Sequence, residues 1–181
     1  WQVRFLEKSG RRPIIFLDEP SLSGFGSAFS SIQRQHVIEI LQMVVSYIQE
    51  HSDSLVGIHC CGNTDWSMIL AARPDIINFD AFAFMEHFLL YPDELSAFLK
   101  AGGTIAWGIV PTADFTGDES AEDLLKKLKE GISKIAKSGV SPRLIAERSI
   151  ITPSCGMGSM APDNARSALN LLARLRDALI D

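Results

Sequence analysis

Five short apolar segments alternate with longer amphipathic segments along the 181 residues of the chain. The apolar runs occupy residues 13–17, 55–61, 76–82, 104–110 and 150–153. Segments that we predict to be helical follow them at residues 31–50, 65–72, 91–100, 121–137 and 163–180. Repeated strand–helix units of this kind are typical of a parallel sheet buried on both faces. The sequence therefore predicts an α/β fold in a single domain that spans residues 1–181.

Two architectures satisfy this alternation, an open doubly wound sheet and a (β/α)8 barrel. The open sheet usually carries a glycine-rich phosphate loop after its first strand, and residues 18–29 (DEPSLSGFGSAF) lack the complete fingerprint. Polar or reactive residues instead follow every strand: Asp18, Glu19, His59, Cys61, Asp80, Thr112 and Cys155. In a barrel all the strand ends converge on one rim, so this pattern favours the TIM barrel.

The length of the chain falls short of a complete barrel. Five strand–helix units are present, whereas a (β/α)8 barrel has eight units and about 250 residues. Residues 1–10 (WQVRFLEKSG) resemble the end of a helix and contain no initiating Met. We therefore expect the C-terminal five βα units of a barrel, with about three units missing. Such a fragment would expose two sheet edges, so we expect it to form a homo-oligomer or to need the missing N-terminal units.

Composition excludes several classes of partner and location. The formal net charge is −5, whereas nucleic acids and anionic membranes attract basic surfaces. No apolar run approaches the roughly 18–20 residues of a membrane span, and the first residues lack the apolar centre of a signal peptide. Three cysteines in a chain of this size do not indicate a disulfide framework. We therefore expect a cytoplasmic protein with reduced thiols and no nucleic-acid or membrane partner.

A possible metal site begins in the second apolar run, at residues 59–61 (HCC). Side chains alternate along a strand, so His59 and Cys61 point the same way and Cys60 points toward the helices. Cys155 follows the fifth run in a similar setting. An imidazole with two thiolates suits Zn²⁺ in a catalytic site that keeps a fourth position open. We predict Asp80 as the fourth ligand, and Glu86 is a poorer alternative.

The same residues also have structural interpretations that involve no ligand. A cysteine on a strand is commonly a buried, inert side chain. Asp18 and Glu19 precede Pro20, so they could end a strand at a turn as readily as they could bind substrate. We expect His36 and His51 to lie on the surface and Trp107 to pack in the core, whereas His87, in a loop after the third strand, is a remote candidate for contact with substrate.

Four segments resemble one superfamily of barrel enzymes. They are LDEP at residues 17–20, IHCCGNTD at 58–65, IINFDAF at 76–82 and ITPSCG at 151–156. Together they are similar to cobalamin-independent methionine synthase, methylcobamide:coenzyme M methyltransferase and uroporphyrinogen decarboxylase, and most similar to the zinc-dependent methyltransferases. The resemblance implies that His59, Cys61 and Cys155 hold zinc and that Asp80 stands where these enzymes usually have a glutamate ligand. It also implies that Asp18 and Glu19 help to hold the substrate.

The function implied by the resemblance is methyl transfer to a thiol. A zinc-dependent methyltransferase would move a methyl group from a methylcorrinoid or methyl-folate donor to a small-molecule thiol, with a corrinoid protein as a partner. Two alternatives stay open. The chain could be a relative of uroporphyrinogen decarboxylase that binds a tetrapyrrole, or a thiol redox protein that uses the adjacent Cys60 and Cys61.

Overall fold

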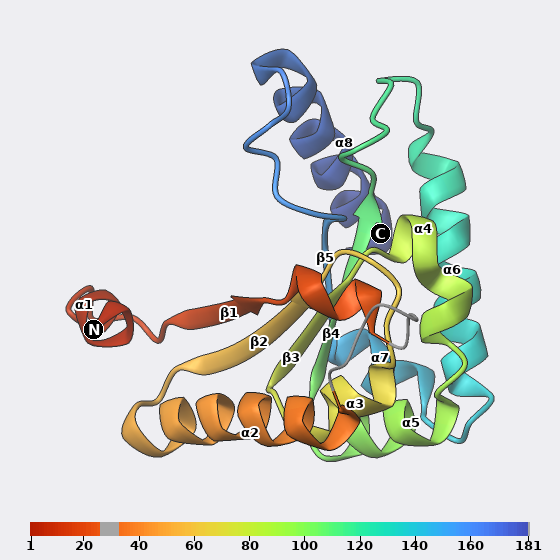
Figure 1. Ribbon diagram of the computed structural model, residues 1–181. Helices are drawn as coiled ribbons and strands as arrows, with labels where there is room; N and C mark the ends of the chain where they lie inside the picture. The colour runs from red at the N-terminus through yellow and green to blue at the C-terminus, as the bar shows by residue number, and fades with distance from the viewer. Residues whose placement is uncertain (26–32, 181) are drawn as a thin grey trace.

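A single five-stranded, all-parallel sheet forms the centre of the computed structural model, which describes residues 1–25 and 33–180 (Figure 1). Its strands are β1 (Ile14–Asp18), β2 (Leu55–Cys60), β3 (Ile76–Phe79), β4 (Thr104–Val110) and β5 (Ser149–Pro153). They lie side by side in chain order. The mixed α/β fold and the parallel sheet expected from the alternating sequence pattern are therefore confirmed.

The helices connect successive strands or flank them. They are α1 (Gln2–Glu7), the 3-10 helix η1 (Pro20–Gly24), α2 (Arg34–His51), α3 (Trp66–Ala71), α4 (Ala81–Phe88), α5 (Pro92–Lys100), α6 (Ala121–Ala136), α7 (Pro142–Glu147) and α8 (Pro162–Ile180). Residues 31 and 32, where the helix predicted at 31–50 begins, lie outside the described residues. So does most of the predicted Gly/Ser-rich loop before it. No helix among the described residues is both long enough and apolar enough to cross a membrane.

The third strand is shorter than the sequence predicts, because Asp80 begins a helix. The expected strand ran to Phe82, whereas β3 ends at Phe79. The Asp80 carboxylate accepts a hydrogen bond from the backbone N–H of Ala83 at 2.8 Å, which caps the first turn of α4. The apolar residues after Asp80 were assigned to the strand because short apolar runs fit a strand and a buried helix equally well.

The helices form one continuous layer on one face of the sheet. Contacts between helices run from α2 through α3, α5 and α6 to α8, and Figure 1 shows this layer curving around the strands. A doubly wound sheet reverses its strand order and carries helices on both faces. The observed order β1-β2-β3-β4-β5 has no reversal, so the described residues do not form a doubly wound sheet. The other face of the sheet, which we call the open face, has no helix of residues 1–25 and 33–180 over it.

Aromatic side chains fill the core between the sheet and the helix layer. Trp66, Phe79, Phe88 and Trp107 are all fully buried. The rings of Phe79 and Phe88 stack with centroids 3.8 Å apart, and Trp66 meets Phe88 edge-on at 5.2 Å. Trp107 therefore packs in the core, as expected. This cluster holds β3 and β4 against α3 and α4 and gives the strand ends a rigid base.

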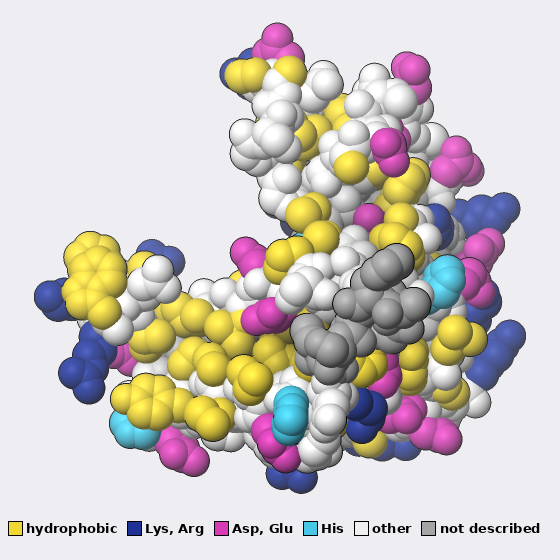
Figure 2. Space-filling model, in the orientation of Figure 1, with side chains coloured by type: hydrophobic (Ala, Val, Ile, Leu, Met, Phe, Trp, Pro, Cys, Tyr) yellow, Lys and Arg dark blue, Asp and Glu magenta, His cyan; other side chains and the backbone are white. Residues whose placement is uncertain are grey.

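Both edges of the sheet carry exposed apolar side chains. At the β1 edge, Ile14 and Phe16 are exposed, and an adjoining stripe on α2 consists of Ile40, Met43, Val44 and Tyr47. Figure 2 shows yellow side chains gathered over β1 and the neighbouring flank of α2. At the β5 edge, a groove of about 590 Å³ between α6, α7 and α8 includes the exposed Ile150 and Leu169. Apolar surface of this extent is typical of a contact region.

Candidate metal centre

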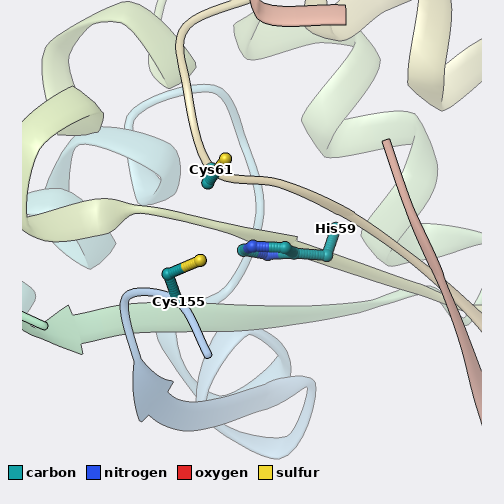
Figure 3. A group of neighbouring side chains, drawn as sticks. All are labelled: His59, Cys61 and Cys155. Atoms are coloured by element: carbon teal, nitrogen blue, oxygen red, sulfur yellow. The ribbon is translucent and has the colours of Figure 1, made fainter. Parts of the chain in front are cut away.

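Three side chains meet at the carboxyl ends of β2 and β5. His59 lies on β2, Cys61 follows the end of that strand, and Cys155 follows β5. Their possible ligand atoms, one from each residue, all lie within 4.8 Å of one another. Figure 3 shows the imidazole of His59 and the sulfur atom of Cys155 directed toward one another, with Cys61 beside them. The structure thus brings together the three residues that the sequence proposed as metal ligands.

The two adjacent cysteines occupy opposite faces of the sheet. Cys60 is fully buried in the core beneath the helices, and its Sγ lies 3.5 Å from the carbonyl oxygen of Gly62. Cys61 is half-buried on the side of His59 and Cys155. Alternation along the strand explains this difference, because successive side chains project to opposite faces. Only the second thiol can reach the metal centre.

A close backbone approach brings Cys155 to the site. A Cβ atom at Gly108 on β4 would lie 2.5 Å from the carbonyl oxygen of Phe79 and 2.7 Å from the Cα of Ser154. The residue before Cys155 can therefore pack directly on β4 only because position 108 has no side chain. The backbone N–H of Ser154 then donates to the carbonyl of Val110 at 2.8 Å. These contacts fix the start of the loop that carries Cys155.

The His59 imidazole has two buried nitrogen atoms, and neither has a hydrogen-bond partner among the described residues. Leaving a buried polar group without a partner costs about 1–3 kcal/mol. Histidine is the commonest metal ligand, and a metal ion would satisfy one of these nitrogens. The arrangement of His59 therefore fits a metal-binding role.

The two thiols of the site also favour a cation between them. Burial raises the pKa of Cys61, and the neighbouring Cys155 raises it further through the repulsion between two thiolates. Without a cation, Cys61 accordingly holds its proton at neutral pH. A bound Zn²⁺ reverses this preference, because a coordinating thiol is deprotonated. Two thiolates and an imidazole are a donor set that suits zinc, so the residues fit this ion.

Asp80 flanks the centre, and its carboxylate serves as the cap of α4. Burial raises its pKa, while hydrogen bonds from the backbone of Ala83 and Phe82 lower it. The charge of Asp80 is close enough to raise the pKa of Cys61. Asp80 does not belong to the three-residue group within 4.8 Å, so its role as the fourth ligand stays a prediction. Glu86 instead pairs with Lys134 on the exposed surface at 2.6 Å.

The acidic pair at the end of β1 divides between two sides of the sheet. Asp18 pairs in register with His59 and lines a pocket of about 510 Å³ that contains the three candidate ligands. Glu19 does not line this pocket, and its charge acts on the buried Cys60. The structure therefore places Asp18 at the site and Glu19 away from it.

Sequence reasoning missed two polar residues of the pocket, Asn78 and Thr152. Asn78 pairs in register with His59 on the neighbouring strand, and Thr152 lies on β5 before Cys155. Both side chains lie on the open face with His59. The register between neighbouring strands decides which side chains lie beside one another, so the sequence alone did not place these two at the site. His87, which the sequence left as a remote candidate, is exposed on α4 and does not line this pocket.

No protein-family model matches the chain, and no curated protein matches it.

Proposed function

We propose that this chain binds a zinc ion through His59, Cys61 and Cys155 and transfers a methyl group to a thiol. The observation that carries the proposal is the convergence of one imidazole and two thiols within 4.8 Å at the rim of a parallel sheet. Ligands at the carboxyl ends of such strands are typical of active sites in barrel enzymes. The four segments that resemble zinc-dependent methyltransferases supply the choice of reaction.

The site's own residues account for substrate binding and orientation. Zinc held there would supply a deprotonated, fixed thiolate from a substrate that is mostly protonated at pH 7. A small-molecule thiol fits the pocket of about 510 Å³. The exposed carboxylate of Asp18 offers that substrate a hydrogen-bond acceptor and a negative charge. The S–CH₃ bond of the product forms as the bond between the methyl group and its donor breaks, and the proton of the substrate thiol passes to solvent.

The methyl donor in this proposal is a methylcorrinoid, delivered by a corrinoid protein, or a methyl-folate. The pocket at the carboxyl ends of the strands gives such a donor access, because Asp18 and Cys155 in its lining are exposed. Reduced thiols at the site suit the cytoplasm, which we propose as the location of the protein.

We also propose that the five βα units belong to a (β/α)8 barrel. The unreversed strand order, the single layer of helices and the two apolar edges all support a sheet that closes on itself. About three further units would cover the open face and pair with β1 and β5. A second copy of the chain is the alternative occupant of these edges.

Metal analysis of the purified protein tests the proposed centre. We expect about one zinc per chain, and much less in a Cys155→Ser variant. A methyl-transfer assay with methylcobalamin and a panel of thiols then tests the reaction, and it should show zinc-dependent formation of thioether. Protein without zinc after expression in zinc-rich medium would refute the proposal.

The two other functions have distinct outcomes in the same experiments. A redox role for the adjacent cysteines would require Cys60 to react, but this thiol is fully buried on the opposite face from Cys61. A tetrapyrrole-binding relative would show a strong visible absorption band. A purified protein that contains zinc and shows no such band would favour the methyltransferase over the redox protein and the tetrapyrrole-binding relative.

A further inference from the structure

The two halves of the metal centre come from strands that are not neighbours. His59 and Cys61 belong to the β2 end and Cys155 to the β5 end, with β3 and β4 between them. We propose that Asn78 is a positioning residue that sets the spacing between these halves. This inference rests on the proposed zinc site and concerns how the chain assembles it.

The Asn78 side chain connects three strands on the open face. Its Nδ2 donates one hydrogen bond to the carbonyl of Ala106 on β4 at 2.9 Å and another to Oγ1 of Thr152 on β5 at 3.0 Å. Asn78 itself pairs in register with His59 on β2. Thr152 lies shortly before Cys155 in the chain. The amide of Asn78, which lies beside His59, therefore links β3 to β5, the strand that leads to Cys155.

The backbone ladder between β4 and β5 is irregular near the end of β5. The pairing of β4 with β5 shifts register between Gly108 and Val110, close to the metal centre. Such irregularities disrupt the ladder locally and change the direction of a strand. On the open face no helix of the described residues packs against this end of the sheet. The hydrogen bonds of Asn78 provide an additional cross-strand connection beside this irregularity.

Small residues on β4 make this connection possible. Ala106 and Gly108 are the β4 residues beside Ile150 and Thr152 in register, and neither has a long side chain. The amide of Asn78 can therefore cross β4 and reach β5. Both of its N–H donors are used in this contact, so substitution by Leu removes the connection without a large change in volume.

Zinc affinity of the full chain tests the inference. We expect Asn78→Leu to bind Zn²⁺ about 10–100-fold more weakly than the unmutated chain in a chelator competition, which is typical when a supporting residue of a metal site is lost. The Co²⁺-substituted variant should also show altered ligand-field bands, since the geometry of its ligands changes. Thr152→Ser keeps the hydroxyl and should retain the affinity, whereas Thr152→Val should lose it in part.

Ser149→Ala is the matched control. Ser149 on β5 accepts a hydrogen bond from Nε1 of Trp107 on β4 at 2.9 Å, so this substitution removes a similar side-chain connection on the helix-covered face. We expect it to lower stability with no change in zinc affinity or in the Co²⁺ spectrum. Equal weakening of zinc binding by Ser149→Ala and Asn78→Leu would overturn the inference. So would unchanged binding by Asn78→Leu, whereas an unmutated chain that binds no zinc would refute the proposed function instead.

Discussion

Replacing sulfur by oxygen at two adjacent positions should have opposite consequences. Cys60 is fully buried beneath the helices and Cys61 lies at the metal centre, so Cys60→Ser perturbs the core and Cys61→Ser perturbs the site. We predict that the first variant loses stability and keeps its zinc affinity. The second should lose zinc affinity and keep the stability of its metal-free form.

The expected magnitudes follow from the two environments. A serine hydroxyl in the core costs about 1–3 kcal/mol when it is poorly paired, and a remaining hydrogen bond to the Gly62 carbonyl would place Cys60→Ser near the lower end. Structural zinc sites contribute about 10–16 kcal/mol, which is about 3 kcal/mol for each of four ligands. Loss of the Cys61 thiolate should therefore weaken zinc binding by about 100-fold.

Urea unfolding of the metal-free proteins measures the first effect, and chelator competition measures the second. The two assays are independent, so a variant that is merely unstable cannot be mistaken for one that lacks a ligand. If Cys60→Ser lost zinc while Cys61→Ser retained it, the assignment of the two side chains to opposite faces would be wrong. Equal losses by both variants in both assays would also contradict it.

Three further predictions concern backbone packing, protons and association. Gly108→Ala should cost about 1–3 kcal/mol in urea unfolding because its Cβ would meet backbone atoms, whereas Gly57→Ala should cost less because its Cβ meets only the partly exposed ring of Phe16. The raised pKa of Cys61 means that zinc uptake near pH 7 should release protons to a pH indicator, and that zinc affinity should rise with pH. In the metal-free protein the raised pKa of Cys61 contributes stability that is fully present below the ordinary thiol pKa of 9.0. This stability is lost as the pH rises through the pKa of Cys61 in the folded state, so the urea midpoint should fall in alkaline buffer. Val44→Lys should reduce self-association in sedimentation experiments, because Val44 belongs to the exposed stripe on α2.

Local sequence rules were sufficient to predict much of the candidate metal centre. Strand alternation separated Cys60 from Cys61, and the structure shows the same separation. The convergence of His59 and Cys155 followed from a general property of parallel sheets, whose carboxyl ends share one edge. Both rules need only the order and direction of strands, and these are encoded in apolar periodicity.

Features that depend on pairing between strands could not be predicted in this way. Asn78 connects β3, β4 and β5, and nothing in its local sequence shows that its amide faces Thr152. The start of α4 was missed because Asp80 both ends a strand and caps a helix, and an apolar run after it is compatible with either element. Glu19 was grouped with Asp18 by proximity in sequence, although alternation alone would have placed the two carboxylates on opposite sides.

The position of the proposed ligands would also couple zinc binding to the fold. His59 and Cys61 come from the β2 end and Cys155 from the β5 end, so the complete set of proposed ligands exists only when β2 through β5 are paired. A ligand that binds only the folded state stabilises it in proportion to the logarithm of its concentration over Kd, by about 4 kcal/mol at a thousandfold excess. Zinc should therefore protect the amides of β3 and β4 from hydrogen exchange, although neither strand supplies any of the three ligands. The Cys155→Ser variant should show no such protection, because its metal would contact only the β2 end.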